Sequence, residues 1–204
     1  TSADGAALFN ISGTSYLENV TVVGNRGGGL VFNDDATLVN LTITGNSGGC
    51  CWVTTSAALN AFGSGTVVTL VNSMLAGNSP SAAFFAGPDS PPNCVTADGG
   101  SIVSLGNNLL GDLAGCELSP LPSDILAEDA DLNPIGPNGV LVPTLNPRIT
   151  SLLVDGGDAD SCPAGDARGI SRPEDGNGDG SASCDIGAVE LREDGLFVSG
   201  FEEL

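Results

Sequence analysis

The sequence predicts an all-β protein: a right-handed parallel β-helix, or solenoid, with a loop-rich C-terminal cap pinned by disulfides. Three observations predict it: a short segment that recurs along the first hundred residues, a composition rich in small and β-branched residues, and six cysteines. Glycine contributes 30 of the 204 residues, whereas aromatic residues make up only 4%. This composition suits many short strands that are joined by tight turns.

The recurring segment is a short apolar strand that ends in Gly-Asn. Its copies begin at Leu17, Leu38 and Leu70, so they lie 21 and then 32 residues apart. A repeat period in this range is typical of solenoids. Coils stacked about 4.8 Å apart bury a column of apolar side chains that no single coil can bury alone. Each period is expected to hold two short strands. An antiparallel sandwich is the alternative, but it does not explain why the same letters recur.

The repeated Gly-Asn pair predicts a turn with a positive φ. Asn side chains at this turn are able to form a ladder from coil to coil. Three Asn-x-Ser/Thr sequons begin at Asn10, Asn19 and Asn40. We interpret them as structural positions in coil turns and strands.

The chain divides into three parts. Residues 1–97 are expected to form the coils, residues 98–192 the last coil and the cap, and residues 193–204 an apolar tail. Twenty of the 25 acidic residues and four of the five Arg follow residue 97. We expect the cap at the C-terminal end of the solenoid, because an open end exposes unpaired strand edges.

The charge excludes several classes of function. The formal net charge is −20, all five basic residues are Arg, and the chain has neither Lys nor His. A surface this negative repels nucleic acid. A Ser-His-Asp site cannot be built from this chain alone. No apolar run approaches the ~20 residues that cross a bilayer, so no membrane span is expected.

The six cysteines predict disulfides and an oxidising compartment, with six reduced thiols as the alternative. Cys94 and Cys116 bracket the last coil, and Cys162 and Cys184 bracket an Arg-Gly-x-x-Arg-Pro segment. We expect these two pairs, each of which contributes about 3 kcal/mol in the chain-entropy model. The adjacent cysteines at 50–51 are left open: they form a strained vicinal disulfide, pair elsewhere or stay free.

Three segments of the C-terminal half follow one another in a specific order. Residues 104–109 read Ser-Leu-Gly-Asn-Asn-Leu, residues 166–173 read Asp-Ala-Arg-Gly-Ile-Ser-Arg-Pro, and residues 184–190 read Cys-Asp-Ile-Gly-Ala-Val-Glu. They resemble the C-terminal module of bacterial secreted β-helix proteins called choice-of-anchor Q domain proteins, which are often found with a CSLREA domain. The resemblance covers about residues 100–192, although the family's Asn-Gly-Gly-Pro-Thr element is degraded at 137–144. It implies an extracellular or cell-surface protein with no established catalytic activity.

One acidic loop is a candidate calcium site. Asp175, Asn177 and Asp179 place oxygen ligands at alternate positions, and a Gly follows at the sixth position. The twelfth position lacks the usual Glu, so Asp185 or Glu190 is the candidate for the remaining ligand. The alternative is a solvated Asp/Gly turn. A structural calcium ion is the only cofactor that we consider.

Arg168 and Arg172 lie among many carboxylates. They fit an anion subsite for an acidic carbohydrate. Our preferred interpretation is that they form internal, fork-shaped bonds to Asp166, Asp185 or Glu190 and so fix the cap.

A polysaccharide lyase or hydrolase is the enzymatic alternative. Hydrolysis needs carboxylates that converge from adjacent coils, and the repeats supply only Glu18, Asp34 and Asp35. A lyase needs a basic residue, and the only one in the repeats is Arg26. We therefore do not expect an enzyme.

The expected function is that of a non-catalytic structural or interaction protein outside the bacterial cell or on its surface. The tail carries the apolar residues Leu196, Phe197, Val198 and Phe201. We expect a head-to-tail homo-oligomer in which the tail of one subunit adds a strand to the open first coil of the next and a filament grows. The alternatives are a fragment of a longer precursor, a carbohydrate-binding or carbohydrate-cleaving β-helix whose partner is cell-surface polysaccharide, and a calcium-stabilised adhesin module.

Overall fold

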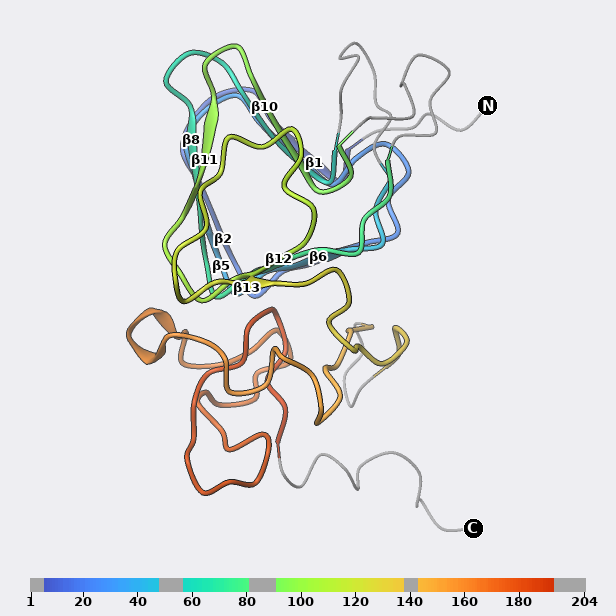
Figure 1. Cartoon of the computed structure of the whole chain (residues 1–204), viewed down its shortest axis with the longest axis vertical. Helices are drawn as coiled ribbons and strands as arrows, with labels where there is room; N and C mark the ends of the chain where they lie inside the picture. Colours follow the sequence, from blue (N-terminus) through green and yellow to red (C-terminus); the bar gives the residue numbers. More distant parts are fainter. Residues whose placement is uncertain (1–5, 48–56, 81–90, 138–142, 193–204) are drawn as a thin grey trace.

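The computed structural model describes residues 6–47, 57–80, 91–137 and 143–192, which form an all-β protein (Figure 1). Thirteen short strands lie in these ranges, together with one turn of 3-10 helix at Ala159–Ser161. In the same ranges, no helix is long and apolar enough to cross a membrane.

The strands form three parallel sheets, and each strand up to β12 lies in the sheet after that of the strand before it. The first sheet contains β1 (Leu8–Asn10), β4 (Leu30–Phe32), β7 (Leu59–Phe62) and β10 (Cys94–Ala97). The second sheet contains β2 (Ser15–Glu18), β5 (Ala36–Val39), β8 (Val67–Val71) and β11 (Ser101–Ser104). The third sheet contains β3 (Thr21–Val23), β6 (Thr42–Thr44), β9 (Met74–Leu75), β12 (Leu109–Leu110) and β13 (Ile125–Leu126).

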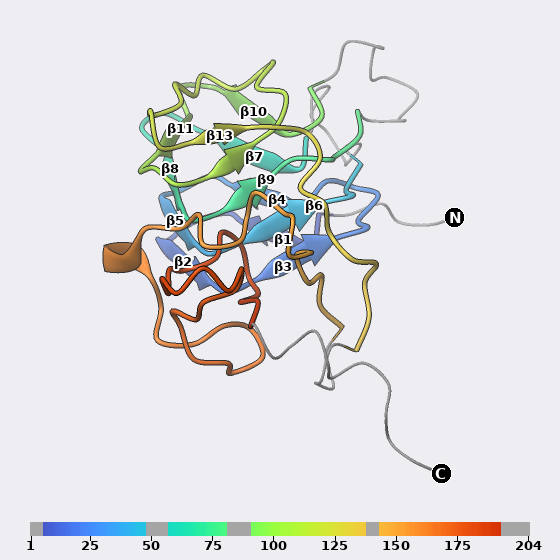
Figure 2. The same ribbon diagram turned by 60° about the horizontal axis from the view of Figure 1, so that its bottom comes forward.

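The three sheets surround a common interior (Figure 1). We call three successive strands a circuit, so that circuits 1 to 4 begin at β1, β4, β7 and β10, and we call their stack the column. Figure 2 shows the column from the side, with β3 at one end and β10, β11 and β13 at the other. The parallel pairing of equivalent strands is consistent with a parallel β-helix.

Each circuit has three strands where the sequence analysis expected two. Asn19, Asn40 and Asn72 lie within the recurring segment, and their φ angles are 56°, 53° and 50°. A left-handed residue cannot continue a strand, so the segment bends there and changes sheets. The prediction of two strands was wrong because the recurring segment spans the corner between the second and third sheets and so contributes to two strands.

The interior is filled by one layer of apolar side chains from each circuit. In the third sheet, Val22, Ile43, Leu75 and Leu110 are in register and form an inward-facing row. Each of the four is at most 4% exposed. This row confirms the expectation that stacking buries what a single circuit cannot.

The Gly-Asn turns also have the expected geometry, since their glycines have positive φ. Asn25 Nδ2 donates to Asn46 Oδ1 over 2.9 Å, and Asn46 Nδ2 donates to Asn78 Oδ1 over 3.0 Å. Asn78 Nδ2 donates in turn to Asn93 Oδ1 over 2.9 Å. The amide ladder therefore runs through the column in one direction.

The segment 111–124 covers the end of the column that lies beyond circuit 4. Leu113, Cys116 and Leu118 pack against the main core cluster. A disulfide joins Cys116 to Cys94 in β10. This short segment covers the end of the column, whereas the sequence analysis expected the cap within the whole of residues 98–192.

Residues 150–192, which we call the lateral module, lie elsewhere. They run along the outside of the column beside the third sheet (Figures 1 and 2). Leu153 and Ile186 form a buried cluster with Met74 and Leu109 on the outer face of that sheet. The expectation that these residues cap the end of the solenoid is therefore corrected. Their partners come from the sides of successive circuits, not from the last circuit alone.

Candidate functional site

One asparagine from each circuit fixes the lateral module to the column. All four occupy the corner between the second and third sheets and have a positive φ. Each Nδ2 group donates to a backbone carbonyl of the module. The donors are Asn19 to Gly165 (2.7 Å), Asn40 to Asp185 (2.9 Å), Asn72 to Asp158 (3.0 Å) and Asn107 to Gly156 (3.0 Å). The column therefore binds the module's backbone at regular intervals.

At the second circuit, further bonds join the module to the column. Asn40 Nδ2 also donates to the carbonyl of Gly187 over 3.2 Å. The backbone N–H of Ala188 donates to Thr42 Oγ1 over 3.0 Å. A Cβ at Gly187 would lie 2.6 Å from the same hydroxyl, and the φ of Gly187 is 99°. Only glycine fits this position without a shift of the backbone.

Within the module, the carboxylate of Asp166 organises a turn and binds Arg168. Its Oδ1 atom accepts the N–H groups of Arg168 (2.7 Å) and Ile170 (3.0 Å). Its Oδ2 atom accepts Arg168 Nε (2.9 Å) and lies 2.8 Å from Nη2. Arg168 Nη2 also donates to the carbonyl of Glu190. The guanidinium group is thus bound inside the module.

Arg172 is bound even more deeply. Its Nη1 atom donates to the Asp185 carbonyl over 2.9 Å, and Nη2 donates to the Gly187 carbonyl over 2.8 Å. Nη1 also lies 3.4 Å from Glu190 Oε2, and neither side chain of this ion pair is exposed. Arg172 and Asn40 bind the same two carbonyls, so the module's central turn is held by both the module and the column.

Asp185 is the third buried carboxylate of this cluster. It accepts the N–H of Asp155 over 2.8 Å and the N–H of Leu191 over 2.5 Å, and it is fully buried. Burial and, next in size, the nearby Glu190 raise the pKa of Asp185 to about 8. Burial also raises the pKa of Glu190. A neutral Asp185 leaves two carboxylates facing the two guanidinium groups, which avoids an unpaired buried charge.

The structure therefore uses Arg168 and Arg172 in internal bonds, in the manner that the sequence analysis preferred over an anion subsite. Their side chains are only 10% and 0% exposed. The partners are Asp166 and Glu190 through their side chains, and Asp185 through its backbone carbonyl.

The two expected disulfides are both formed. Cys94–Cys116 ties circuit 4 to the covering segment, and Cys162–Cys184 lies in the lateral module. Cys184 is fully buried, and its Sγ lies 3.2 Å from Arg172 Nη1. The second disulfide thus borders the buried ion pair. The cysteines at 50–51 lie outside the described residues.

The candidate calcium loop uses its carboxylates to bind its own backbone. Asp175 accepts the N–H groups of Gly178, Asp179 and Gly180 over 2.7–3.1 Å. Asn177 Oδ1 accepts the Asp179 N–H over 2.8 Å. Asp185, the proposed fourth ligand, is bonded within the buried cluster instead. Among the described residues, no group of three or more acidic, His or Cys side chains is placed to hold a metal ion. Calcium binding stays a prediction.

The carboxylates of the repeats bind neighbouring backbone or side-chain groups. Asp34 Oδ2 accepts the N–H of Gly13 over 2.8 Å, and this bond lowers the pKa of Asp34. Asp35 Oδ1 accepts the N–H of Val67 over 2.9 Å. Glu18 accepts the hydroxyl of Tyr16. The expectation about catalysis stays a prediction.

The predicted assembly residues Leu196, Phe197, Val198 and Phe201 lie outside the described residues. The docking role of the corner asparagines was missed by sequence reasoning. The available signal was the Asn that recurs at the third position of the repeated segment, as in Asn19, Asn40 and Asn72. The sequence showed that this position repeats, but not that a distant segment binds there.

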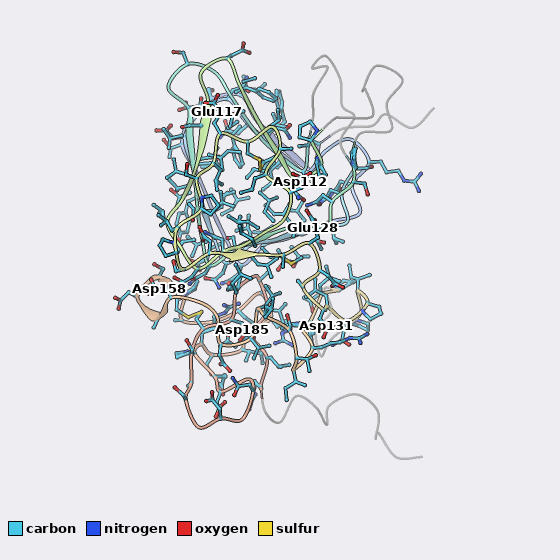
Figure 3. All side chains as sticks on the ribbon, viewed as in Figure 1. Asp112, Glu117, Glu128, Asp131, Asp158 and Asp185 are labelled. Atoms are coloured by element: carbon cyan, nitrogen blue, oxygen red, sulfur yellow. A yellow bond between two sulfur atoms is a disulfide. The ribbon has the colours of Figure 1, made fainter. Side chains whose placement is uncertain are left out.

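No family model matches this chain, and neither a curated protein nor a solved structure matches it. The resemblance to choice-of-anchor Q domain proteins therefore stays a prediction. Figure 3 shows the side chains of both regions, with Asp158 and Asp185 in the lateral module and Asp112 and Glu128 on the column.

Proposed function

We propose that this protein is a non-catalytic structural and interaction protein, secreted or displayed on the bacterial cell surface, and that it is built as a right-handed parallel β-helix. The cyclic order of the strands among three sheets supports the solenoid. Two disulfides are compatible with an extracellular protein. The resemblance of residues 100–192 to a secreted family supports the same location.

One observation carries the proposed interaction: the three strands of circuit 1 are all outermost strands of their sheets. On β1, Leu8 N donates to Gly29 O over 3.2 Å, and Asn33 N donates to Asn10 O over 3.0 Å. In a parallel sheet, alternate residues bond to opposite sides of the strand. The N–H and C=O of Phe9 therefore point away from β4, where they are able to pair with an added strand.

The proposed occupant of this edge is the apolar tail of a second copy, with Leu196, Phe197, Val198 and Phe201. Circuit 1 also presents half-buried apolar side chains to the interior, among them Leu17. An apolar strand would complete their burial. Because each subunit contributes a different surface, the contact is heterologous and grows a filament unless the ring closes.

The test is the association state of the full chain, followed by light scattering and negative-stain microscopy at several concentrations. Phe9→Pro removes the outward N–H without removing a bond to β4, whereas Phe9→Ala removes the same side chain and keeps the N–H. We expect the wild type and Phe9→Ala to assemble and Phe9→Pro to stay monomeric. A wild-type chain that is monomeric at every concentration overturns the proposal, as does a Phe9→Pro variant that assembles normally.

Calcium at Asp175, Asn177 and Asp179 and a cell-surface polysaccharide partner stay predictions beside this function. The melting temperature in calcium and in chelator tests the first. Depletion of acidic polysaccharide from solution by the immobilised protein tests the second.

A further inference from the structure

The end of the column opposite circuit 1 also carries an edge strand. Among the described strands of the third sheet, β13 lies outermost and pairs only with β12. Its Leu126 is in register with Leu110, which is fully buried in the main core. Leu126 therefore continues the inward-facing row, yet it is 65% exposed. An exposed apolar edge of this kind attracts another strand unless something prevents it.

A carboxylate ends a ladder of polar groups just before β13. The N–H of Ser73 donates to Asn108 Oδ1 over 2.9 Å. The N–H and Nδ2 of Asn108 donate to Asp124 Oδ1 over 2.9 and 3.1 Å. Asp124 Oδ2 also accepts Ser104 Oγ (2.6 Å) and the N–H of Leu121 (2.7 Å). An ionised carboxylate accepts hydrogen bonds and donates none, so the ladder stops at this residue.

A second carboxylate ends the asparagine ladder just after β13. Asn93 Nδ2 lies 3.4 Å from Glu128 Oε1, which also accepts the N–H of Asp112. Glu128 Oε2 accepts the N–H of Gly77 over 3.1 Å. Figure 3 labels Glu128 and Asp112 close to each other on the column. Every amide of this ladder donates toward the β13 end, where Glu128 receives the last bonds.

We propose that Asp124 and Glu128 prevent a strand of a second copy of this chain from pairing with the β13 edge. The covering segment 111–124 occupies the rest of this end, so the β13 edge is where a second copy could pair. The matching strand of a second copy is β3, whose Val22 would follow Leu126 in the inward-facing row. At the ladder position, Glu128 would then meet Asn25 of that copy. Asn25 Oδ1 accepts no hydrogen bond from the described residues, so two acceptors would face each other without a proton between them. The β13 end thus forces copies to associate through another surface.

Charge adds to this mismatch. Each copy carries a formal net charge of −20, and the two carboxylates flank an edge strand of only two residues. Short edge strands and charged neighbours are the means by which natural sheets avoid pairing with each other. The short strand β13 contains the exposed Leu126 and has a carboxylate on each side, so it combines both features.

Glu128→Gln tests the proposal because glutamine supplies an amide donor for Asn25 of a second copy. It keeps one acceptor oxygen for the column, at the cost of one of the backbone bonds that Glu128 accepts. Glu117→Gln is the matched control. It makes the same change of charge at the same end, and the Glu117 side chain is exposed and makes no hydrogen bond among the described residues. Sedimentation velocity of the full chains should show self-association about tenfold stronger for Glu128→Gln than for Glu117→Gln, the gain of about one good hydrogen bond.

A second substitution locates the contact. Leu126→Asp, added to Glu128→Gln, restores a charge on the exposed edge and should return self-association to the level of Glu117→Gln. If Glu128→Gln does not fold, Asp124→Asn takes its place, since asparagine also supplies a donor at the edge. The inference fails if the folded variant associates no more strongly than Glu117→Gln, or if Leu126→Asp leaves its association unchanged. The assembly of the wild type tests the proposed function and the difference between these variants tests the inference about the β13 edge, so the two fail separately.

Discussion

The column and the lateral module are held together by different kinds of interaction. In the column, each strand pairs in parallel with the equivalent strand of the next circuit, and apolar rows such as Val22 to Leu110 fill the interior. The described part of the module has one turn of 3-10 helix and two isolated bridges, Gly165 to Ser171 and Glu174 to Ser183. Buried charges and amide-to-backbone bonds hold it in place.

This difference has a consequence for stability. A residue of the column bonds with its own counterpart in the next circuit, so the free energy of unfolding is a sum of similar layers. The module is attached to the column by individual polar bonds between residues that lie far apart in the chain, such as Asn72 with Asp158 at a separation of 86 residues. Changes in the module should therefore have large effects at a few positions and small effects elsewhere.

The largest effect is expected for Arg172→Met. The change leaves the carboxylate of Glu190 buried without its cation and removes the donors to two carbonyls. Removal of one partner from a buried ion pair costs about 3–5 kcal/mol. Denaturant unfolding, together with limited proteolysis of residues 150–192, measures the loss.

The control for this change is Arg148→Met. Arg148 pairs with Asp131 over 3.5 Å, but the two side chains are 53% and 44% exposed. Exposed pairs contribute about 0–1 kcal/mol. Similar losses for the two variants would contradict the view that burial makes the module sensitive.

The next effect is the removal of a disulfide by Cys162→Ser with Cys184→Ser. The loop spans 22 residues, so the loss should be about 3 kcal/mol in the chain-entropy model. Proteolysis should open the lateral module first, while the circular dichroism of the sheets persists.

The pair Cys94–Cys116 has the same separation of 22 residues and is the matched comparison. Its removal should cost a similar amount of free energy but should loosen the end of the column instead of the module. Identical cleavage patterns for the two double variants would show that the two regions do not unfold separately.

The third effect is a loss of module stability as pH rises. A folded pKa of about 8 for Asp185 means that the folded protein keeps a proton that the unfolded chain releases near pH 4. The contribution of Asp185 to stability is therefore complete below about pH 4 and falls by at most about 1.4 kcal/mol per pH unit up to the folded pKa of about 8. Chemical unfolding at pH 6 and pH 8 measures the change, which should stay under about 3 kcal/mol.

Asp185→Asn should flatten this pH dependence, because the amide does not ionise. The substitution also costs the bond to one backbone N–H, so the slope with pH is the informative quantity, not the absolute stability. An unchanged slope would mean that Asp185 is not the group that takes up the proton.

The smallest effect is expected for Asn40→Gly. Glycine adopts the φ of 53° without strain, so the change removes only the side-chain donors to Asp185 and Gly187. The loss should be about 1–2 kcal/mol. Asn78→Gly, in the amide ladder, is the comparison. It should weaken the column but leave the proteolytic resistance of the module unchanged.

Much of the column was predictable from the sequence. The spacing of Leu17, Leu38 and Leu70 indicated stacked units, and the Gly-Asn letters indicated positive-φ turns with an amide ladder. The number of strands in each unit was predicted wrongly. Asn at positions 19, 40 and 72 is compatible with both a strand and a left-handed corner, and only the closure of each circuit around a core selects the corner.

The candidate site was less predictable. Arg168 and Arg172 were recognised as partners of nearby carboxylates because those residue types lie within about 25 residues of one another. The position of the module was predicted wrongly, since the same sequence is compatible with a cap on the end of the column and with a module along its side. Asn107 binds the module, and Glu128 ends the amide ladder. Both roles depend on residues that lie far away in the chain, such as Gly156 and Gly77.

The sequence by itself determined the features that depend on neighbouring residues and on repetition: short strands, left-handed turns, apolar rows and the two cysteine pairs. The strands, turns and apolar rows follow from local steric preferences and from a period that each circuit repeats, and the cysteine pairs from the segments that the cysteines bracket. Only the tertiary structure decided that residues 150–192 lie along the column, that Asp185 is buried with a raised pKa, and that carboxylates flank β13. Burial, the pKa shift and the order of a ladder all depend on which distant groups meet, and no local pattern of residues specifies that.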